Sequence, residues 1–384
     1  MLRALTERGG PAATGLHVVA INEPAADPAS IEYLTRFDST HGRFPGRVGL
    51  DGGRLLIDGE PLRLHHAADG GAIDWAAEDI DLLLDCSGSF STRAGAAPLF
   101  AAGAPRVLVS QPMASAAEVD ATVVYGINHE SLSGHERLVS NASCTTNCIV
   151  PVLAVLDAAF GIESGCITTL HSVMNDQPLI DGWHATADLR RTRSAMQSMI
   201  PVATGLARGI DRLLPGLAGR IVTKAVRVPT LNVSALDTVL MMTRDVDAAT
   251  VNAVLQAAAA TSPLAGLLDY TELPHASCDF NHDPHSAVVD GSLTHVAGRR
   301  LLGVMLWFDN EWGFAHRMLD TAAHWLARAD SRSSFRAATP HGSIRWASTR
   351  FVRSRFTVRS MTIPAVTMKL SPATANSHAL GTRC

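Results

Sequence analysis

SNASCTTNC, residues 140–148, stands where the pattern of the sequence changes. Before it, short apolar runs alternate with segments of helical pattern, which predicts a doubly wound α/β sheet through about residue 142. After it, long strand-like runs follow one another with few helices between them. That pattern is typical of a mixed, largely antiparallel sheet covered on one side. The stretch therefore marks a boundary between two domains.

The same stretch places Cys144 where it can act as a nucleophile. Residues 149–160 predict a helix that ends at Gly161, so Ser143 is expected to cap it and Cys144 to lie in its first turn. Free backbone amides and the positive end of the helix dipole favour an anion there, and hence the thiolate. Taken alone, Cys144 also fits a small buried cysteine with no role in catalysis.

Composition excludes several classes of protein. The chain has 384 residues, of which 47% are hydrophobic and 18% charged, which predicts two or three globular domains. Its six cysteines form no CxxC pair, so neither a disulfide framework nor a metal site is expected, and a reducing cytoplasm fits best. We expect no secretory signal and no membrane partner, because no apolar run reaches the length of about 18 residues that spans a bilayer.

The last part of the chain differs in charge from the rest. From Ser331 onward there are eight arginines, one lysine and no acidic residue, in a chain whose net charge is −4. Residues 331–384 also lack helical or strand periodicity, so we expect a disordered or spurious tail. A nucleic-acid partner is not expected, although a basic tail is the feature that would support one.

The amino-terminal half carries signs of a dinucleotide site. Residues 16–23 predict a buried parallel strand that ends in Asn22 and Glu23, and an acidic residue there typically holds the adenosine ribose about 20 positions after a GxGxxG turn. No GxGxxG occurs in the chain, so we expect the first strand of the sheet and its glycine turn to be missing. A solvated charge at a strand end is the alternative interpretation of Glu23.

Five motifs in this order resemble the glyceraldehyde-3-phosphate dehydrogenase superfamily. They are SNASCTTNC (140–148), TTLHS (168–172), RTRSAMQSMIP (191–201), AVRVPTLNVSALD (225–237) and DNEWGFAHRM (309–318). The resemblance covers residues 1 to about 329. MNDQ (174–177), LRRTRSA (189–195) and SCDFNHDPHSAVVDG (277–291) look most like the branch that oxidises D-erythrose 4-phosphate in pyridoxal 5'-phosphate biosynthesis.

The resemblance implies an NAD-dependent aldehyde dehydrogenase that works through a covalent thioester. Cys144 would attack the aldehyde, and His171 would act as base and later activate water for hydrolysis. The substrate, a small phosphorylated sugar, would be held by Ser143, Thr145, Arg193, Thr204, Gly205 and Arg227. NAD would be held by Asn22, Glu23, Ser87, Gly88, Ser110 and Asn310. No residue is implied as a metal ligand.

The domain plan that follows is a Rossmann-type NAD-binding domain and a second, catalytic domain. The first covers residues 1–143, is incomplete, and is completed by a helix over 311–329; the second covers residues 144–310. A cytoplasmic homotetramer is also implied.

Other functions stay open from the sequence. Met174 replaces the threonine that usually contacts the substrate phosphate in glycolytic members, which argues against the triose substrate. A phosphorylating glyceraldehyde-3-phosphate dehydrogenase and an inactive truncated remnant are nevertheless alternatives, as is a binding protein that uses the basic tail.

Overall fold

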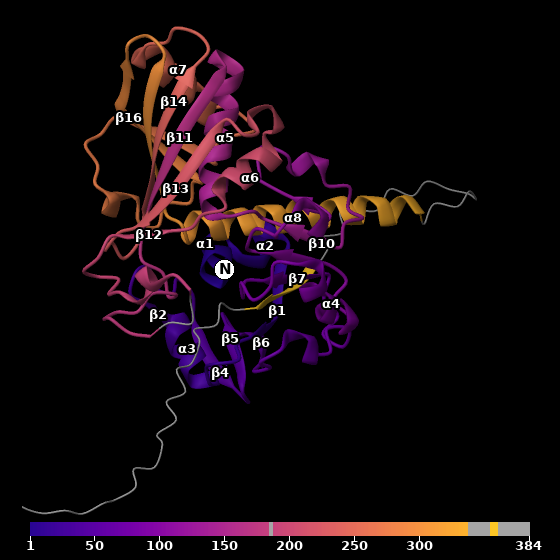
Figure 1. Ribbon diagram of the computed structural model, residues 1–384. Coiled ribbons are helices and arrows are strands. Elements are labelled where there is room, and N and C mark those ends of the chain that lie inside the picture. The colour runs from indigo at the N-terminus through magenta and orange to yellow at the C-terminus, as the bar shows by residue number, and fades with distance from the viewer. Residues whose placement is uncertain (184–186, 337–353, 360–384) are drawn as a thin grey trace, which may run out of the picture.

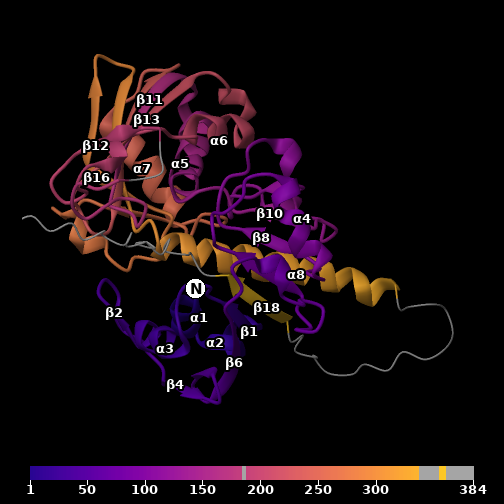
Figure 2. The ribbon, with the colours of Figure 1, turned by 60° about the horizontal axis from the view of Figure 1, so that its bottom comes forward.

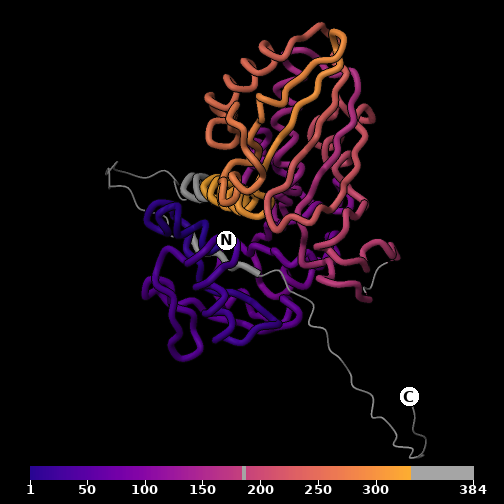
Figure 3. Tube along the Cα trace, turned by 90° about the vertical axis from the view of Figure 1, so that its left-hand side faces the viewer, coloured from indigo at the N-terminus to yellow at the C-terminus, as the bar shows by residue number. Residues whose placement is uncertain are grey.

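The computed structural model describes residues 1–183, 187–336 and 354–359, which form two lobes (Figures 1 and 3). A long helix, α8 (Trp312–Arg336), runs between the lobes and contacts α1 (Leu2–Glu7) and α5 (Cys144–Phe160). No helix among the described residues combines the length and the apolar character needed to cross a membrane.

The first lobe is built on a nine-stranded sheet in the order β4-β5-β6-β1-β18-β7-β8-β10-β9. From β6 to β9 neighbouring strands run parallel, whereas β4, β5 and β6 form an antiparallel edge. The strands are β1 (Leu16–Asn22), β4 (Val48–Asp51), β5 (Arg54–Ile57), β6 (Glu60–His65), β7 (Leu82–Asp85), β8 (Val107–Val109), β9 (Ala121–Thr122) and β10 (Leu138–Ser140). Strands β7 and β8 are fully buried, which is why their sequences are almost continuously apolar.

Strand β18 (Ser354–Arg359) corrects two predictions. It lies parallel between β1 and β7, with Leu16 opposite Ser354 and Leu82 opposite Phe356. The position expected to be empty for want of a first strand is therefore filled, which gives β1 and β7 a partner for backbone groups that would otherwise be unpaired. Figure 2 shows β18 beside β1.

The tail predicted to be disordered, residues 331–384, is thus ordered in part. Residues 331–336 continue α8, and residues 354–359 form β18. The rest of that prediction, for residues 337–353 and 360–384, lies outside the described residues.

The second lobe is a seven-stranded mixed sheet in the order β12-β13-β11-β14-β17-β16-β15. Its strands are β11 (Ile162–His171), β12 (Ile200–Val202), β13 (Ile221–Arg227), β14 (Ser234–Met242), β15 (Leu268–Thr271), β16 (Ala287–Ala297) and β17 (Leu301–Phe308). Helices α5, α6 (Leu206–Leu213) and α7 (Ala248–Ala259) share one apolar core with this sheet. The predicted fold class, a Rossmann-type domain followed by a mixed-sheet domain, is confirmed.

The remaining elements are short. They are α2 (Gly10–Thr14), α3 (Pro28–Arg36), α4 (Arg93–Ala101), β2 (Phe37–Asp38) and β3 (Gly42–Arg43). Single 3₁₀ turns cover Gly70–Ala72, Ala116–Glu118, His129–Ser131, Leu189–Thr192, Pro215–Leu217 and Ser277–Phe280.

Helix α8 completes the core of the first lobe. Trp312, Leu319 and Trp325 pack in one cluster with residues of β7 and β10, and Trp325 is wholly buried. Thr321 of the same helix donates a hydrogen bond to the side chain of Asn141, 2.8 Å away, just before the cysteine stretch. The helix predicted over 311–329 therefore belongs to the first lobe, although it follows the second in sequence.

Candidate active site

Cys144 occupies the predicted place at the start of α5. Ser143 has an extended backbone, and its hydroxyl accepts a hydrogen bond from the amide of Thr146 at 3.1 Å, as an N-cap residue does. Ala142 before it has a φ of +57°, so the chain turns sharply between β10 and the helix. The sequence thus predicted both the cap and the position of the thiol.

His171, the last residue of β11, faces the thiol. Its Nε2 lies 3.8 Å from Sγ of Cys144, although the two residues are 27 positions apart. Nδ1 of the same ring lies 2.9 Å from the carbonyl oxygen of Ser172. Because a carbonyl oxygen only accepts, the proton of a neutral His171 ring sits on Nδ1, and Nε2 is free to take a proton from sulfur.

Burial favours the neutral forms of both groups. It raises the pKa of the Cys144 thiol to about 11, against the opposing effects of the Thr145 amide and the Arg227 charge. It also lowers the pKa of His171 to about 4, in the same direction as the Arg227 charge. Burial thus opposes the resting thiolate that the helix position predicts, because loss of solvation acts against the charged form. It favours a thiol beside a neutral imidazole.

Cys144 and His171 line a cavity of about 360 Å³, whose wall contains residues of both lobes. Of the predicted substrate-binding residues, the cavity brings together Ser143, Thr145, Thr204, Gly205 and Arg227. It is also lined by residues that the sequence did not single out, namely Pro112, Thr122, Ala142, Thr146, Thr169, Val202, Ala203, Leu206, Gly209, Arg212 and Ala225.

Two buried polar atoms in this cavity lack a partner. Nη1 of Arg227 and Oγ1 of Thr169 are shielded from solvent and form no hydrogen bond. Arg227 ends β13 directly opposite His171 in the parallel pair β11–β13 and forms no ion pair with a carboxylate among the described residues. The Asp176 charge acts on Arg227 from nearby, but a buried guanidinium nitrogen without a hydrogen-bond partner is still costly, so these groups indicate a site for an anionic ligand.

Arg193 does not join this cavity, which corrects its predicted role. Its side chain is exposed and forms an ion pair with Asp181, with Nε and Oδ2 2.8 Å apart. The same carboxylate accepts a hydrogen bond from the backbone of Ser194. The Asp181 carboxylate therefore holds this arginine away from Cys144, in the segment that precedes β12.

Arg212 is the cation that the sequence analysis missed. It lies on α6, and its guanidinium donates to Oγ1 of Thr122 at 3.2 Å and to the carbonyl of Met113 at 3.4 Å. Gly205, Gly209 and Arg212 are spaced by four and three residues, so they share one face of a helix. Following the helical period onward from Gly205 would have found it.

The predicted cofactor residues lie at the carboxyl ends of parallel strands, where such sheets bind nucleotides. Asn22 and Glu23 end β1, and Ser87 and Gly88 follow β7. The side chain of Asn22 exchanges two hydrogen bonds of 3.0 Å with the backbone of Ala67, which makes it a support for the loop. One oxygen of Glu23 accepts from the amide of Ala25, at 3.1 Å.

Ser87, Gly88 and Ser110 lie at the same edge of the sheet. The hydroxyl of Ser87 donates to Asp85 at 2.6 Å, and that of Ser110, which follows β8, lies 3.4 Å from Oε1 of Gln111. Gly88 has a φ of +63°, and a Cβ there would meet no atom within 4 Å. The chain is therefore open at this point to a close ligand.

Asn310 is hydrogen-bonded to Ser172, the residue that follows His171. Its Oδ1 accepts hydrogen bonds from the hydroxyls of Ser172 and Ser234, each 2.9 Å away. With its oxygen taken, the amide group of the side chain is left as the donor for a carboxamide oxygen. Ser172 and Ser234 are orienting residues that the sequence analysis did not name.

These residues fit the two ends of NAD. Glu23 suits the hydroxyls of the adenosine ribose, and Asn310, linked through Ser172 to His171, suits the nicotinamide amide. Amides for the pyrophosphate are expected after the central strand of the sheet. The residues that follow β18 lie outside the described part of the chain.

Two family models match the chain. Residues 1–93 match the model described as glyceraldehyde 3-phosphate dehydrogenase, NAD binding domain, and residues 143–310 match the C-terminal domain of the same enzyme. The second match begins at the residue that caps α5 and ends at Asn310.

Proposed function

Because this chain belongs to the glyceraldehyde 3-phosphate dehydrogenase family, with NAD as its cofactor, we propose that it oxidises D-erythrose 4-phosphate to 4-phosphoerythronate. The thioester formed on the way is released by water, and the product serves pyridoxal 5'-phosphate biosynthesis. The observation that carries the chemistry is the Cys144–His171 pair, with its 3.8 Å separation, in a cavity where one buried nitrogen of Arg227 has no hydrogen-bond partner among the described residues.

The first step is attack of sulfur on the aldehyde. As Sγ of Cys144 bonds to the carbonyl carbon, Nε2 of His171 takes the thiol proton, which its neutral state allows. The carbonyl oxygen gains charge and is stabilised by the backbone N–H of Cys144 at the helix start. When bound, NAD supplies the acceptor for the hydride that leaves the aldehyde carbon. The product is a thioester on Cys144.

The same base serves the second half-reaction. After the imidazolium has lost its proton to solvent, Nε2 of His171 accepts a proton from water as the water attacks the thioester. The hydrogen bond from Nδ1 to the Ser172 carbonyl keeps Nε2 directed at the sulfur throughout. Acid and thiol are the products, and the resting pair is restored.

The choice of sugar rests on the motifs and on Met174. Met174 contributes no hydroxyl, does not line the cavity, and lies in a turn where its backbone amide donates to Gln177 at 3.1 Å. A threonine-based phosphate site of the glycolytic kind is therefore not supported. The longer sugar phosphate, and hydrolysis rather than phosphorolysis, agree with the MNDQ and LRRTRSA segments.

Turnover of the two sugars tests the proposal. NADH formation, followed by absorbance, is expected with D-erythrose 4-phosphate in the absence of inorganic phosphate, and to be much slower with glyceraldehyde 3-phosphate. Preference for the triose together with strict dependence on inorganic phosphate would overturn the substrate and the release step. It would leave the thioester chemistry in place.

We also propose that the protein is a homotetramer of the cytoplasm. An apolar segment supports assembly: Leu179, Ile180 and Trp183 are 72%, 74% and 88% exposed, and Leu189 and Met199 are similarly exposed. Patches of this kind on a folded chain usually mark a protein interface. Light scattering is expected to give the mass of four chains, and the mass of one chain would refute the assembly.

A further inference from the structure

Two arginines from different elements line the Cys144 cavity. Arg227 ends β13 in the second lobe's sheet, and Arg212 lies near the end of α6. Neither forms an ion pair with Asp or Glu in the part of the chain that the structure describes, whereas Arg193 is paired with Asp181. The cavity is therefore lined by two positive charges and by no Asp or Glu, although the charge of Asp176 acts on Arg227 from nearby.

Arg212 is held in place by neutral groups. The hydroxyl of Thr122 and the carbonyl of Met113 accept two of its hydrogen bonds, both from the first lobe. A guanidinium has five N–H donors, so donors are left over for a ligand. Burial and the nearby Arg208 charge lower the pKa of Arg212. Both effects disfavour the charged form, as expected where no anion is bound.

The rest of the wall also offers donors. Helix α6 begins after Gly205, which provides no side-chain cap; the amide of Leu206 donates to Oγ1 of Thr204 at 3.2 Å, and the next amide has no partner within the helix. Helix α5 begins at the same cavity with Cys144 and Thr145. Thr169, 1% exposed, points a partnerless hydroxyl into the cavity wall. Amides, hydroxyls and two guanidinium groups together suit a phosphate dianion.

We propose that Arg212 binds the phosphate group of the substrate together with Arg227, in the role that the resemblance gives to Arg193. The inference rests on the proposed function for the identity of the sugar, but the binding of phosphate can be measured without turnover. Since α6 carries Arg212 and is tied by it to Thr122 of the first lobe, the same contact would fix the phosphate relative to both lobes.

The test measures how well inorganic phosphate protects Cys144 against iodoacetamide. Modification is followed by mass spectrometry of the peptide that contains Cys144, because Cys278 is exposed and also reacts. The full chain is used, and the quantity compared is the phosphate concentration that gives half-protection.

Arg212→Met is expected to raise that concentration about tenfold or more, because a charged hydrogen bond to the dianion is lost. Arg220→Met is the control: Arg220 lies just before β13, is exposed, and does not line the cavity, so a change of less than about twofold is expected. Arg227→Met is expected to behave like Arg212→Met.

An unchanged half-protection concentration in a folded Arg212→Met variant would overturn the proposal. Folding is checked by thermal melting. Should the methionine variant fail to fold, Arg212→Gln decides by the same criterion, since its amide still donates to Thr122 and to the Met113 carbonyl.

A second arm separates the two sources of phosphate. If Arg212 binds the phosphate of the sugar, Arg212→Met raises the KM for D-erythrose 4-phosphate about tenfold and leaves kcat nearly unchanged. Lost protection with an unchanged KM would assign Arg212 to free phosphate and overturn its role toward the substrate. If the wild-type chain does not oxidise this sugar, the proposed function fails, but the protection assay still decides whether Arg212 binds phosphate.

Discussion

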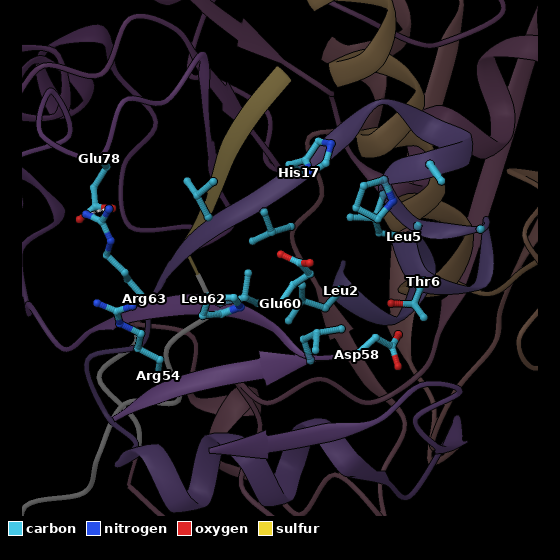
Figure 4. A pocket seen from close by; sticks show the side chains of 18 residues that line it. Leu2, Leu5, Thr6, His17, Arg54, Asp58, Glu60, Leu62, Arg63 and Glu78 are labelled. Atoms are coloured by element: carbon cyan, nitrogen blue, oxygen red, sulfur yellow. Dashed lines mark ion pairs between the residues drawn. The ribbon is translucent and has the colours of Figure 1, made fainter. Parts of the chain in front are cut away.

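Two cavities in the described part of the molecule differ in chemistry, and the smaller one contains Cys144 and His171. The larger, about 670 Å³, lies between α1, α2 and strands β1, β5 and β6 (Figure 4). Its wall contains one ion pair: Arg63 lies 3.0 Å from Glu78, which also contacts His65. In the cavity of about 360 Å³, Cys144 faces His171, and Nη1 of Arg227 has no hydrogen-bond partner among the described residues. The thiol–imidazole pair, rather than volume, distinguishes the smaller cavity.

The position of each cavity in its sheet agrees with this difference. Strand β1 pairs with β6 only from Ala20 to Asn22, so the amino-terminal parts of the two strands separate and leave the larger cavity. It touches His17, Val18 and Val19, at the end of β1 opposite to the carboxyl edge where α/β sheets bind ligands. The larger cavity is therefore a product of strand divergence.

Replacing the nucleophile gives the largest expected contrast. Cys144→Ser should lower kcat for aldehyde oxidation by about 10⁴-fold or more, because a hydroxyl cannot replace the thiol in the thioester route. Cys148→Ser, four residues on in the same helix and fully buried, is the control. Steady-state NADH formation checks both. Retained turnover in a folded Cys144→Ser protein would remove the basis of the proposed mechanism.

Replacing the base gives the next largest expected effect. His171→Asn should lower kcat by about 10²- to 10³-fold, since proton transfer from sulfur and from water then lacks its acceptor. A variant with normal kcat would show that the 3.8 Å contact has no part in the reaction.

The pH dependence of alkylation tests the resting state of the pair. With a Cys144 pKa of about 11, the thiolate fraction grows about tenfold per pH unit below that value, so the rate should rise about a hundredfold from pH 7 to pH 9. His171, whose pKa is about 4, stays neutral over this range and does not alter the slope. A rate that is flat from pH 7 to pH 9 would instead indicate a resting thiolate, as the helix position alone predicts.

The smallest effect on catalysis is expected in the larger cavity. Arg63→Met removes the partner of the buried Glu78 and should lower the free energy of unfolding by about 1 kcal/mol, because the arginine itself is half exposed. The value of kcat/KM should stay within about twofold of wild type. Arg54→Met, which lines the same cavity, is the control. A large loss of kcat/KM in either variant would give this cavity a function and undo the comparison.

Local features of the sequence predicted the start of the active site well. The cap at Ser143 and the place of Cys144 depend on contacts within one helical turn, which spacing reveals. The partnership with His171 depends on two elements 27 residues apart, and only the resemblance pointed to it. The ionisation of Cys144 stays a prediction: the helix end, which favours the thiolate, is a local effect, whereas the burial that opposes it is set by the whole fold.

Arginines show where sequence reasoning fails. Arg193 and Arg212 are both plausible anion ligands by residue type, and the choice between them is made by Asp181, which pairs with the first. Spacing does not reveal such a pairing. Strand β18 was missed for a similar reason: it is six residues long, and its place depends on β1 and β7, far away in the sequence.

One expected strand is shorter in the structure because the side chain of Asn128 bonds to its backbone. Residues 122–126 predict a strand, but β9 ends at Thr122. Asn128 accepts a hydrogen bond from the amide of Val124 and donates one to the carbonyl of Thr122, both at 2.8 Å. These bonds replace the ladder of a sheet with a turn, as asparagine side chains often do.

Helix α8 has a consequence for the order in which the nascent polypeptide folds on the ribosome. The core of the amino-terminal lobe contains Trp312, Leu319 and Trp325, which are translated after the whole of the other lobe. Until they emerge, the apolar faces of β7 and β10 lack the part of their cover that α8 supplies, while residues 144–310 already possess every strand and helix of their own core. The half synthesised second is therefore free to fold first, and the half synthesised first is the one that depends on chaperones in the meantime.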